Sequence, residues 1–265
     1  MGLMYSKETD RLVDRAEIAS LPVPAAMGRF HHPYPFADYI DDVTCALDSM
    51  GLVVAEEEYA VTNDNNRMFG LMRLRWSDTG SGFGDSPDWA AIIGLRGSHD
   101  QRIPRGLVLG SHVFVCSNLC FHGNIANLTT KQTLNIVKRM PTLLEDTLMQ
   151  LPGMVGMQRR VFDKWRNHAV SDNQAKETFI DLYRRGAFSS PQLTRAVDQF
   201  FEPDHEEHMA EGRTLWTLFN ASTEALKPTG SSTNMHLIED RTRVVSDHLS
   251  ALVGENSFRP LGEAA

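Results

Sequence analysis

The spacing of apolar residues changes from a strand-like to a helix-like period near Thr130, and this change limits the fold more than any other feature of the chain. Before that point, segments rich in apolar residues predict β-strands over residues 52–62, 67–76, 89–96 and 107–117. The first two are joined by the run from Asn63 to Asn66, whose Asn and Asp residues tolerate left-handed turn conformations. A four-stranded antiparallel meander is the simplest sheet that these segments form.

Helical periodicity occurs once before the strands, over residues 36–50, and dominates the chain after Thr130. The later pattern predicts helices over 130–151, 158–168, 173–185, 191–201, 205–226 and 234–253. Pro141 is expected to break or kink the first of them, since proline donates no helical hydrogen bond. Strands followed by helices indicate an α+β fold, with an antiparallel sheet in the first half and a mostly helical second half. We expect one compact domain over residues 1–265, in which 1–128 are mainly β and 129–265 are helical.

The composition favours a cytoplasmic protein. The chain has 265 residues, 42% of them hydrophobic, which is enough to bury a substantial core. It contains no run of the roughly 20 apolar residues that a membrane-spanning helix requires, so no membrane partner is expected. The N-terminal segment carries charges of both signs and lacks the apolar stretch of a secretory signal. The three cysteines do not suggest a disulfide framework.

Charge is distributed unevenly along the chain. Residues 96–166 contain ten Lys or Arg and four acids, a net +6, whereas the whole chain is −8 and the rest is therefore −14. This asymmetry predicts a local site for a polyanion, and nucleic acid is the leading candidate. The structural alternative is a solvated face whose cations pair with the acidic parts of the chain.

Single-stranded nucleic acid is bound by cations along its backbone and by flat side chains that stack on its bases, and residues 158–166 supply both. The candidate nucleic-acid-binding residues are Arg159, Arg160, Lys164, Trp165 and Arg166 in this segment, Lys131, Lys138 and Arg139 upstream, and Arg102 and Arg105 in the loop before the last predicted strand. Phe162 and Trp165 also have the helical spacing of core aromatics. A polar and aromatic arm, expected either to close over a bound strand or to pack as a connection, comprises Arg29, His31, His32, Tyr34 and Phe36.

Sequence patterns for catalysis are weak. The glycine-rich loop from Gly80 to Gly84 lies between two predicted strands, and the helix that would complete a phosphate-binding loop does not follow it. No phosphate-binding loop, nucleophile-elbow or zinc-protease pattern occurs. We therefore expect a protein that is not an enzyme. The alternative is a metal-dependent DNA-processing enzyme that uses His99, Asp100 and the acidic helices.

Two clusters contain residue types that bind metal ions. His112, Cys116, Cys120 and His122 fall within eleven residues, but buried structural cysteines explain that cluster better. His205 and His208 lie beside carboxylates that equally suit the start of a helix. We expect no metal ion and no other cofactor.

Residues 94–124, GLRGSHDQRIPRGLVLGSHVFVCSNLCFHGN, contain a Ser98-His99-Asp100 loop and a Cys116-Ser117-Asn118 element. This segment resembles a family of phage and plasmid proteins of unknown function. Ser98, His99 and Asp100 are consecutive and therefore do not form a catalytic triad, whose members converge from separate places in the fold. A role for Ser98 and Asp100 in stabilising the loop is the structural interpretation.

The size, acidic balance and layout of the chain are similar to those of the single-stranded-DNA-binding cofactors of phage RNA polymerase. That resemblance implies a protein of the host cell cytoplasm that binds melted promoter DNA and recruits a phage RNA polymerase. No residue is carried over from it. A non-enzymatic single-stranded-DNA-binding protein is the resulting hypothesis, and an acidic protein-interaction module that acts on a host factor is a further alternative.

Overall fold

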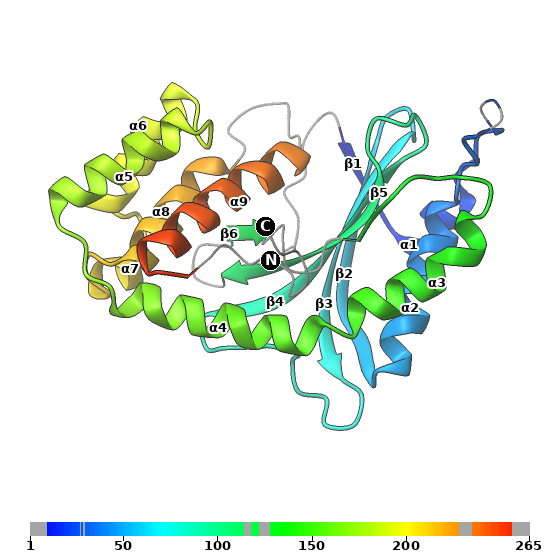
Figure 1. The fold of residues 1–265 in the computed structure, drawn as a ribbon, viewed down its shortest axis with the longest axis horizontal. Helices are drawn as coiled ribbons and strands as arrows, with labels where there is room; N and C mark the ends of the chain where they lie inside the picture. Colours follow the sequence, from blue (N-terminus) through cyan, green and yellow to red (C-terminus); the bar gives the residue numbers. More distant parts are fainter. Residues whose placement is uncertain are drawn as a thin grey trace.

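The computed structural model describes residues 10–26, 28, 30–113, 118–121, 128–227 and 235–255. The strands in these ranges form one antiparallel sheet in the order β1-β2-β3-β4-β5-β6 (Figure 1), and β6 and β7 pair with opposite ends of β5. The strands are β1 Asp10–Val13, β2 Leu52–Thr62, β3 Arg67–Trp76, β4 Trp89–Ser98, β5 Arg105–Val113, β6 Asn118–Phe121 and β7 Leu128–Thr130. The predicted antiparallel sheet is confirmed, with β2 to β5 as its meander.

The sheet is wider than the sequence pattern indicates. β2 and β3 have the predicted bounds, whereas β4 continues to Ser98 and β5 begins at Arg105. The predicted end of the last strand, residues 114–117, lies outside the described residues. The three short strands β1, β6 and β7 were not predicted, because three or four residues are too few to show a period of two.

The second half of the chain is mostly helical, as predicted. The helices are α1 Arg15–Ser20, α2 Phe36–Ser49, α3 Ile136–Leu148, α4 Leu151–Asn167, α5 Asp172–Arg184, α6 Ser190–Phe201, α7 Glu206–Ala210, α8 Leu215–Leu226 and α9 Met235–Leu252. Of these, α1 and the separate short α7 were not predicted. No helix in the described ranges is both long enough and apolar enough to cross a membrane.

Two helix breaks differ from the sequence prediction. Helix α3 runs through Pro141 without a break, and the interruption comes at Met149 and Gln150 instead. Pro141 lies in the second turn, so the helix loses only the hydrogen bond that its missing N–H would donate to Val137. The predicted helix over 205–226 is divided, because Gly212 has a left-handed φ of 72° and ends the α7 segment.

The sheet is covered on both faces. Apolar residues such as Ile93 and Leu109 face a large core that continues into α2, α3, α4 and the later helices. On the opposite face, Phe69, Ile92 and neighbouring residues pack against Ile238 of α9. Figure 1 shows α3 and α4 following one another along one side of the molecule, which places the basic segment on its surface.

Candidate nucleic-acid interface

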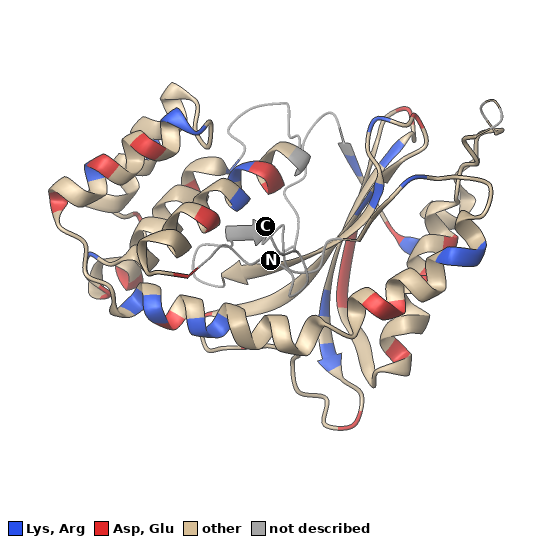
Figure 2. Cartoon of the chain, in the orientation of Figure 1, with Lys and Arg blue, Asp and Glu red and all other residues tan. Residues whose placement is uncertain are grey.

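The cations of α4 lie on the side of the helix that faces solvent. Arg159, Arg160 and Lys164 are exposed, while the opposite side of α4 is buried. Figure 2 shows Lys and Arg gathered on the C-terminal half of this helix. The helical pattern in the sequence indicated this position for Arg160 and Lys164, whereas it grouped Arg159 with Phe162, which is buried.

Nearby groups compensate part of this charge. Lys164 forms an ion pair with Glu255, and Arg166 forms one with Asp88. Arg159 donates a hydrogen bond to the backbone carbonyl of Asp85, at 3.1 Å, and has no ion pair with the described residues. Arg160 has neither kind of contact within the described ranges, so Arg159 and Arg160 are the α4 cations most available to a phosphate.

Trp165 does not offer a stacking surface, which corrects the sequence prediction. Its side chain is buried, 5.3 Å from the ring of Phe162 and 5.0 Å from that of Phe219 between centroids. The guanidinium of Arg166 lies 4.3 Å from the Trp216 ring and closes this aromatic cluster from outside. The core interpretation of Phe162 and Trp165 is the one the structure supports.

Arg105 is also buried, so it is not exposed for contact with a nucleic acid. Its side chain points into the layer between the sheet and α2, where the guanidinium lies 4.7 Å from the centroid of Phe36. It donates hydrogen bonds to the carbonyl of Tyr34 and, at 3.3 Å, to Oε1 of Gln132. The sequence prediction failed here because β5 begins two residues earlier than its apolar pattern suggests, which turns Arg105 inwards with Leu107 and Leu109.

Arg102 is highly exposed at the turn between β4 and β5, far along the sheet from α4. Its Nε lies 3.8 Å from Asp100, whose carboxylate also forms a 2.8 Å ion pair with Arg67. Burial alone would raise the pKa of Asp100, but hydrogen bonds from Arg67, Ser98 and the Arg102 backbone together lower it. The Ser98-His99-Asp100 motif thus stabilises its own turn.

Lys131, Lys138 and Arg139 are exposed around the start of α3, and none of them forms an ion pair with the described residues. The first turn of α3 contains no acid, and its N-cap residue Asn135 makes no side-chain cap hydrogen bond. The N–H groups of a first helical turn carry partial positive charge and lack partners within the helix. In α3, the N–H of Ile136 already donates to the carbonyl of Thr133 at 2.9 Å, so the cations and the rest of the first turn are what attract an anion.

Exposed apolar side chains lie among these cations. Leu134 is 69% exposed and Val137 is 59% exposed. We call Lys131, Leu134, Val137, Lys138 and Arg139 the α3 surface. Phe30, 76% exposed, belongs to the neighbouring segment, which is joined to this one by a 3.0 Å hydrogen bond from His32 N–H to the Gln132 carbonyl.

Sequence reasoning missed the apolar part of this surface, although a signal was present. The buried stripe of α3 is Ile136, Met140, Leu144 and Leu148, at an even spacing of four. Leu134 and Val137 do not belong to that stripe, which marks them as exposed.

In the polar and aromatic arm, His31, Tyr34 and Phe36 are buried, so the arm packs as a connection. Arg29 lies outside the described residues.

The α3 surface and the α4 cations do not form one patch. Arg139 and Arg159 are 20 positions apart in the sequence, a path of roughly 30 Å along the two helices at about 1.5 Å per residue. Glu145 and Asp146 are exposed between them, as the red segment of α3 in Figure 2 shows. A ligand that touches both ends must therefore be extended.

The described ranges contain no group of three His, Cys, Asp or Glu side chains arranged to hold a metal ion. Cys116, His122 and the side chain of Cys120 lie outside those ranges. His99 is buried, and its pKa is lowered to about 4 by burial and by the nearby Arg105 and His31, so it is neutral at pH 7. With Asp100 engaged by Arg67, the geometry gives no support to a reaction centre built on this pair.

Comparison with known proteins gives no relative from which a function could be inferred. No protein-family model, no curated protein and no solved structure matches the chain. The resemblances to phage and plasmid proteins and to phage polymerase cofactors therefore stay expectations, and the exposed charge on α3 and α4 is what carries the functional argument.

Proposed function

We propose that the chain binds single-stranded DNA, without catalysing a reaction on it, through the α3 surface and through Arg159 and Arg160 of α4. The observation that carries the proposal is the α3 surface itself. It combines three cations that have no ion pair with the described residues, a helix start without an acid, and exposed apolar side chains.

Each part of this surface matches one part of a single strand. Phosphates are attracted by the cations and by the N–H groups at the start of α3. Unpaired bases present apolar faces, which suit the exposed side chains of Leu134 and Val137. A strand of several nucleotides then continues along α3 towards Arg159 and Arg160.

The charge of the rest of the chain favours a single strand over duplex DNA. The chain is −8 overall, so a rigid duplex, which carries more charge per length, is repelled by the acidic remainder of the molecule. Its bases are also stacked and paired, which removes the contact with the apolar side chains. Binding is therefore weakly sequence-selective and falls steeply with salt.

The proposed partner is a phage RNA polymerase that the bound protein recruits to melted promoter DNA in the host cytoplasm. This part of the proposal rests on the resemblance in size, charge and layout. Acidic residues exposed at the end of α6 and in α7 offer a surface of opposite charge to the α3 surface, on which a second macromolecule can bind without competing for DNA.

The proposal is tested by fluorescence anisotropy with labelled single-stranded and duplex oligonucleotides at low and moderate salt. We expect Lys138→Ala with Arg139→Ala to weaken single-strand binding at least about tenfold and to reduce the log–log salt slope by about 1.4, at about 0.7 per phosphate contact. Arg184→Ala with Arg185→Ala, the same charge change at the exposed end of α5, is the matched control and should change neither value much.

Two results would contradict binding of single-stranded DNA through the α3 surface. One is the absence of single-strand binding by the wild-type chain at low salt, which would favour the protein-interaction alternative. The other is an equal loss of affinity in the α3 and α5 variants, which would show that only net charge matters. Loss of intact oligonucleotide on addition of Mg²⁺ would instead support the DNA-processing enzyme.

A further inference from the structure

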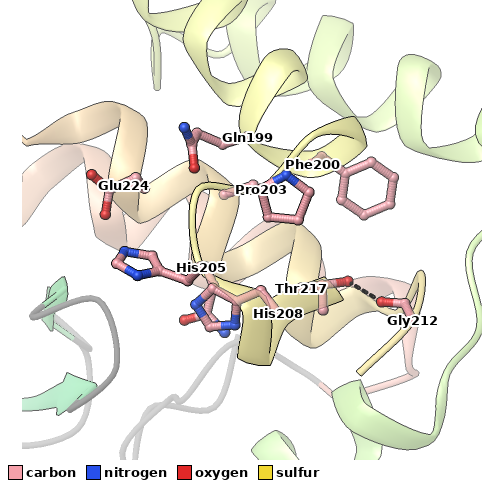
Figure 3. A pocket seen from close by; sticks show the side chains of 10 residues that line it. Gln199, Phe200, Pro203, His205, His208, Gly212, Thr217 and Glu224 are labelled. Atoms are coloured by element: carbon pink, nitrogen blue, oxygen red, sulfur yellow. Dashed lines mark hydrogen bonds between the residues drawn. The ribbon is translucent and has the colours of Figure 1, made fainter. Parts of the chain in front are cut away.

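A small pocket lies between the end of α6, α7 and α8 (Figure 3). Its cavity of about 20 Å³ has room for one atom the size of a water molecule. The side chains around it are mostly polar, and they include His205, His208 and Asn220. The pocket is therefore too small for an organic ligand but suits a single ion.

His208 is oriented towards this pocket by a carboxylate. Its Nδ1 lies 3.4 Å from Oε2 of Glu211, and the other oxygen of Glu211 accepts a 3.2 Å hydrogen bond from Nε1 of Trp216. A carboxylate only accepts hydrogen bonds, so Nδ1 is the ring nitrogen that donates, and Nε2 is the nitrogen left for a metal ion. That Nε2 atom is buried and has no hydrogen-bond partner.

A second imidazole stands beside the first. The ring centroids of His205 and His208 are 5.8 Å apart and the rings are perpendicular. Two imidazoles that share one metal ion, with metal–nitrogen distances of about 2.0–2.1 Å, have centroids about 5–6 Å apart. Figure 3 shows the two rings next to each other at the pocket, and their centroid separation of 5.8 Å falls in this range.

The charge around the pocket attracts cations. Residues 202–211 contain five acids and no Lys or Arg. Glu224, which also lines the pocket, is neutralised by a 2.9 Å ion pair with Arg195 and by a further pair with Lys227, so it is not counted as a ligand. The local field therefore favours a divalent cation while leaving the two imidazoles as the donors.

We propose that His205 and His208 bind a divalent first-row transition metal ion such as Zn²⁺, with Glu211 as the residue that orients His208. An imidazole whose other nitrogen donates to a carboxylate is the usual arrangement of a metal-bound histidine. Oxygen atoms of the other side chains around the pocket complete the coordination, because the cavity has no room for a water molecule beside the ion and the described ranges offer no third His, Cys, Asp or Glu in place. Both imidazoles belong to α7 and its N-cap, so the ion is connected to α8 only through an oxygen atom of the pocket lining.

Isothermal titration calorimetry of the full chain with Zn²⁺ alone tests this site. We expect one equivalent of moderate affinity that is lost in His208→Gln and in His205→Ala. Glu211→Gln keeps the size of the side chain but removes its charge, and should weaken binding about 10–100-fold. His168→Gln changes an exposed histidine at the end of α4 and should leave binding unaltered.

The other potential zinc ligands of the chain provide the decisive control. Cys116→Ser with Cys120→Ser should leave this equivalent intact. The proposal is overturned if the wild-type chain binds no Zn²⁺, or if the equivalent survives in the His205→Ala, His208→Gln double variant. Circular dichroism of each variant without metal verifies that the fold is retained.

Discussion

Arg105 carries its positive charge in the interior, where the described residues offer it no carboxylate. Three aromatic rings surround it, with Phe36 at 4.7 Å and Tyr39 at 5.2 Å from the guanidinium carbon. Burial lowers its pKa to about 10, so it is still charged at neutral pH. The side chain fits because residue 97 is glycine: a Cβ there would come within 2.7 Å of Nη1. At the residue scale, this one side chain links the arm, the sheet and the segment that leads into the α3 surface.

The charge of Arg105 has a consequence for His99. The pKa of His99 is lowered from 6.5 to about 4 by burial first, and then by Arg105 and His31. Between these values the unfolded chain takes up a proton that the native state does not, so stability falls as the pH drops through this range. We expect the wild-type chain to lose about 2 kcal/mol more unfolding free energy between pH 7 and pH 5 than His99→Gln loses.

Denaturant unfolding at the two pH values measures this difference. His112 and His248 are also partly or fully buried and their pKa values are lowered. The unfolding free energy of His99→Gln therefore still changes with pH, with a smaller slope than that of the wild type. His168→Gln, at an exposed position, should keep the wild-type slope. Equal slopes in the wild type and His99→Gln would show that His99 titrates normally in the folded chain.

At the scale of elements, the beginnings and ends of helices decide where the functional groups lie. The start of α3 has no acid and no side-chain cap, so no carboxylate of its first turn neutralises the positive end of the helix. After the break between α7 and α8, in contrast, side chains cap the start of the helix. There, Thr214 and Thr217 cap α8 reciprocally, with hydrogen bonds of 3.2 Å and 3.0 Å between backbone N–H groups and hydroxyl oxygens.

Removal of this cap should destabilise the fold. In Thr214→Ala, the N–H of Thr217 loses its acceptor at the start of a helix that is buried along its whole length. We expect a loss of about 1 kcal/mol in unfolding free energy, within the range of about 0.5–2 measured for such caps. Thr194→Ala, at an exposed position within α6, is the control and should change stability by less than about 0.5 kcal/mol. An equal effect in both variants would contradict the capping role.

At the scale of the whole molecule, the two halves of the sequence are joined by a buried ion pair. Arg96 of β4 donates to Glu239 of α9 at 2.6 Å, and their side chains are only 15% and 5% exposed. Burial raises the pKa of Glu239 although Arg96 opposes the shift. The pair fixes α9 on the face of the sheet where Ile238 packs against Phe69 and Ile92.

A double-mutant cycle measures this connection. Arg96→Met leaves the carboxylate of Glu239 buried without this partner and should cost about 3–5 kcal/mol of unfolding free energy. Arg96→Met with Glu239→Leu removes both charges and should recover most of that loss. Additive effects of the two single changes would show that the pair is not coupled in the folded chain.

The sequence by itself determined the secondary-structure types and the order of the main elements. Strand and helix periods reflect which side of an element is buried, and that signal is local, so β2 to β5 and the exposure of Arg160 and Lys164 were predictable. The strand β1 and the break between α7 and α8 were not, because pairing with a distant strand and the backbone at Gly212 decided them.

Only the tertiary structure decided which charged and aromatic residues are available to a ligand. Arg105 and Trp165 have the chemistry of a nucleic-acid site in the sequence, yet both are buried, since each lies on the side of its element that faces the core. The pairing of Lys164 with Glu255, and the meeting of His205, His208 and Glu211 with α8, depend on how the chain folds back on itself. A linear pattern specifies which groups exist; packing determines which of them face solvent, a partner charge or a cavity.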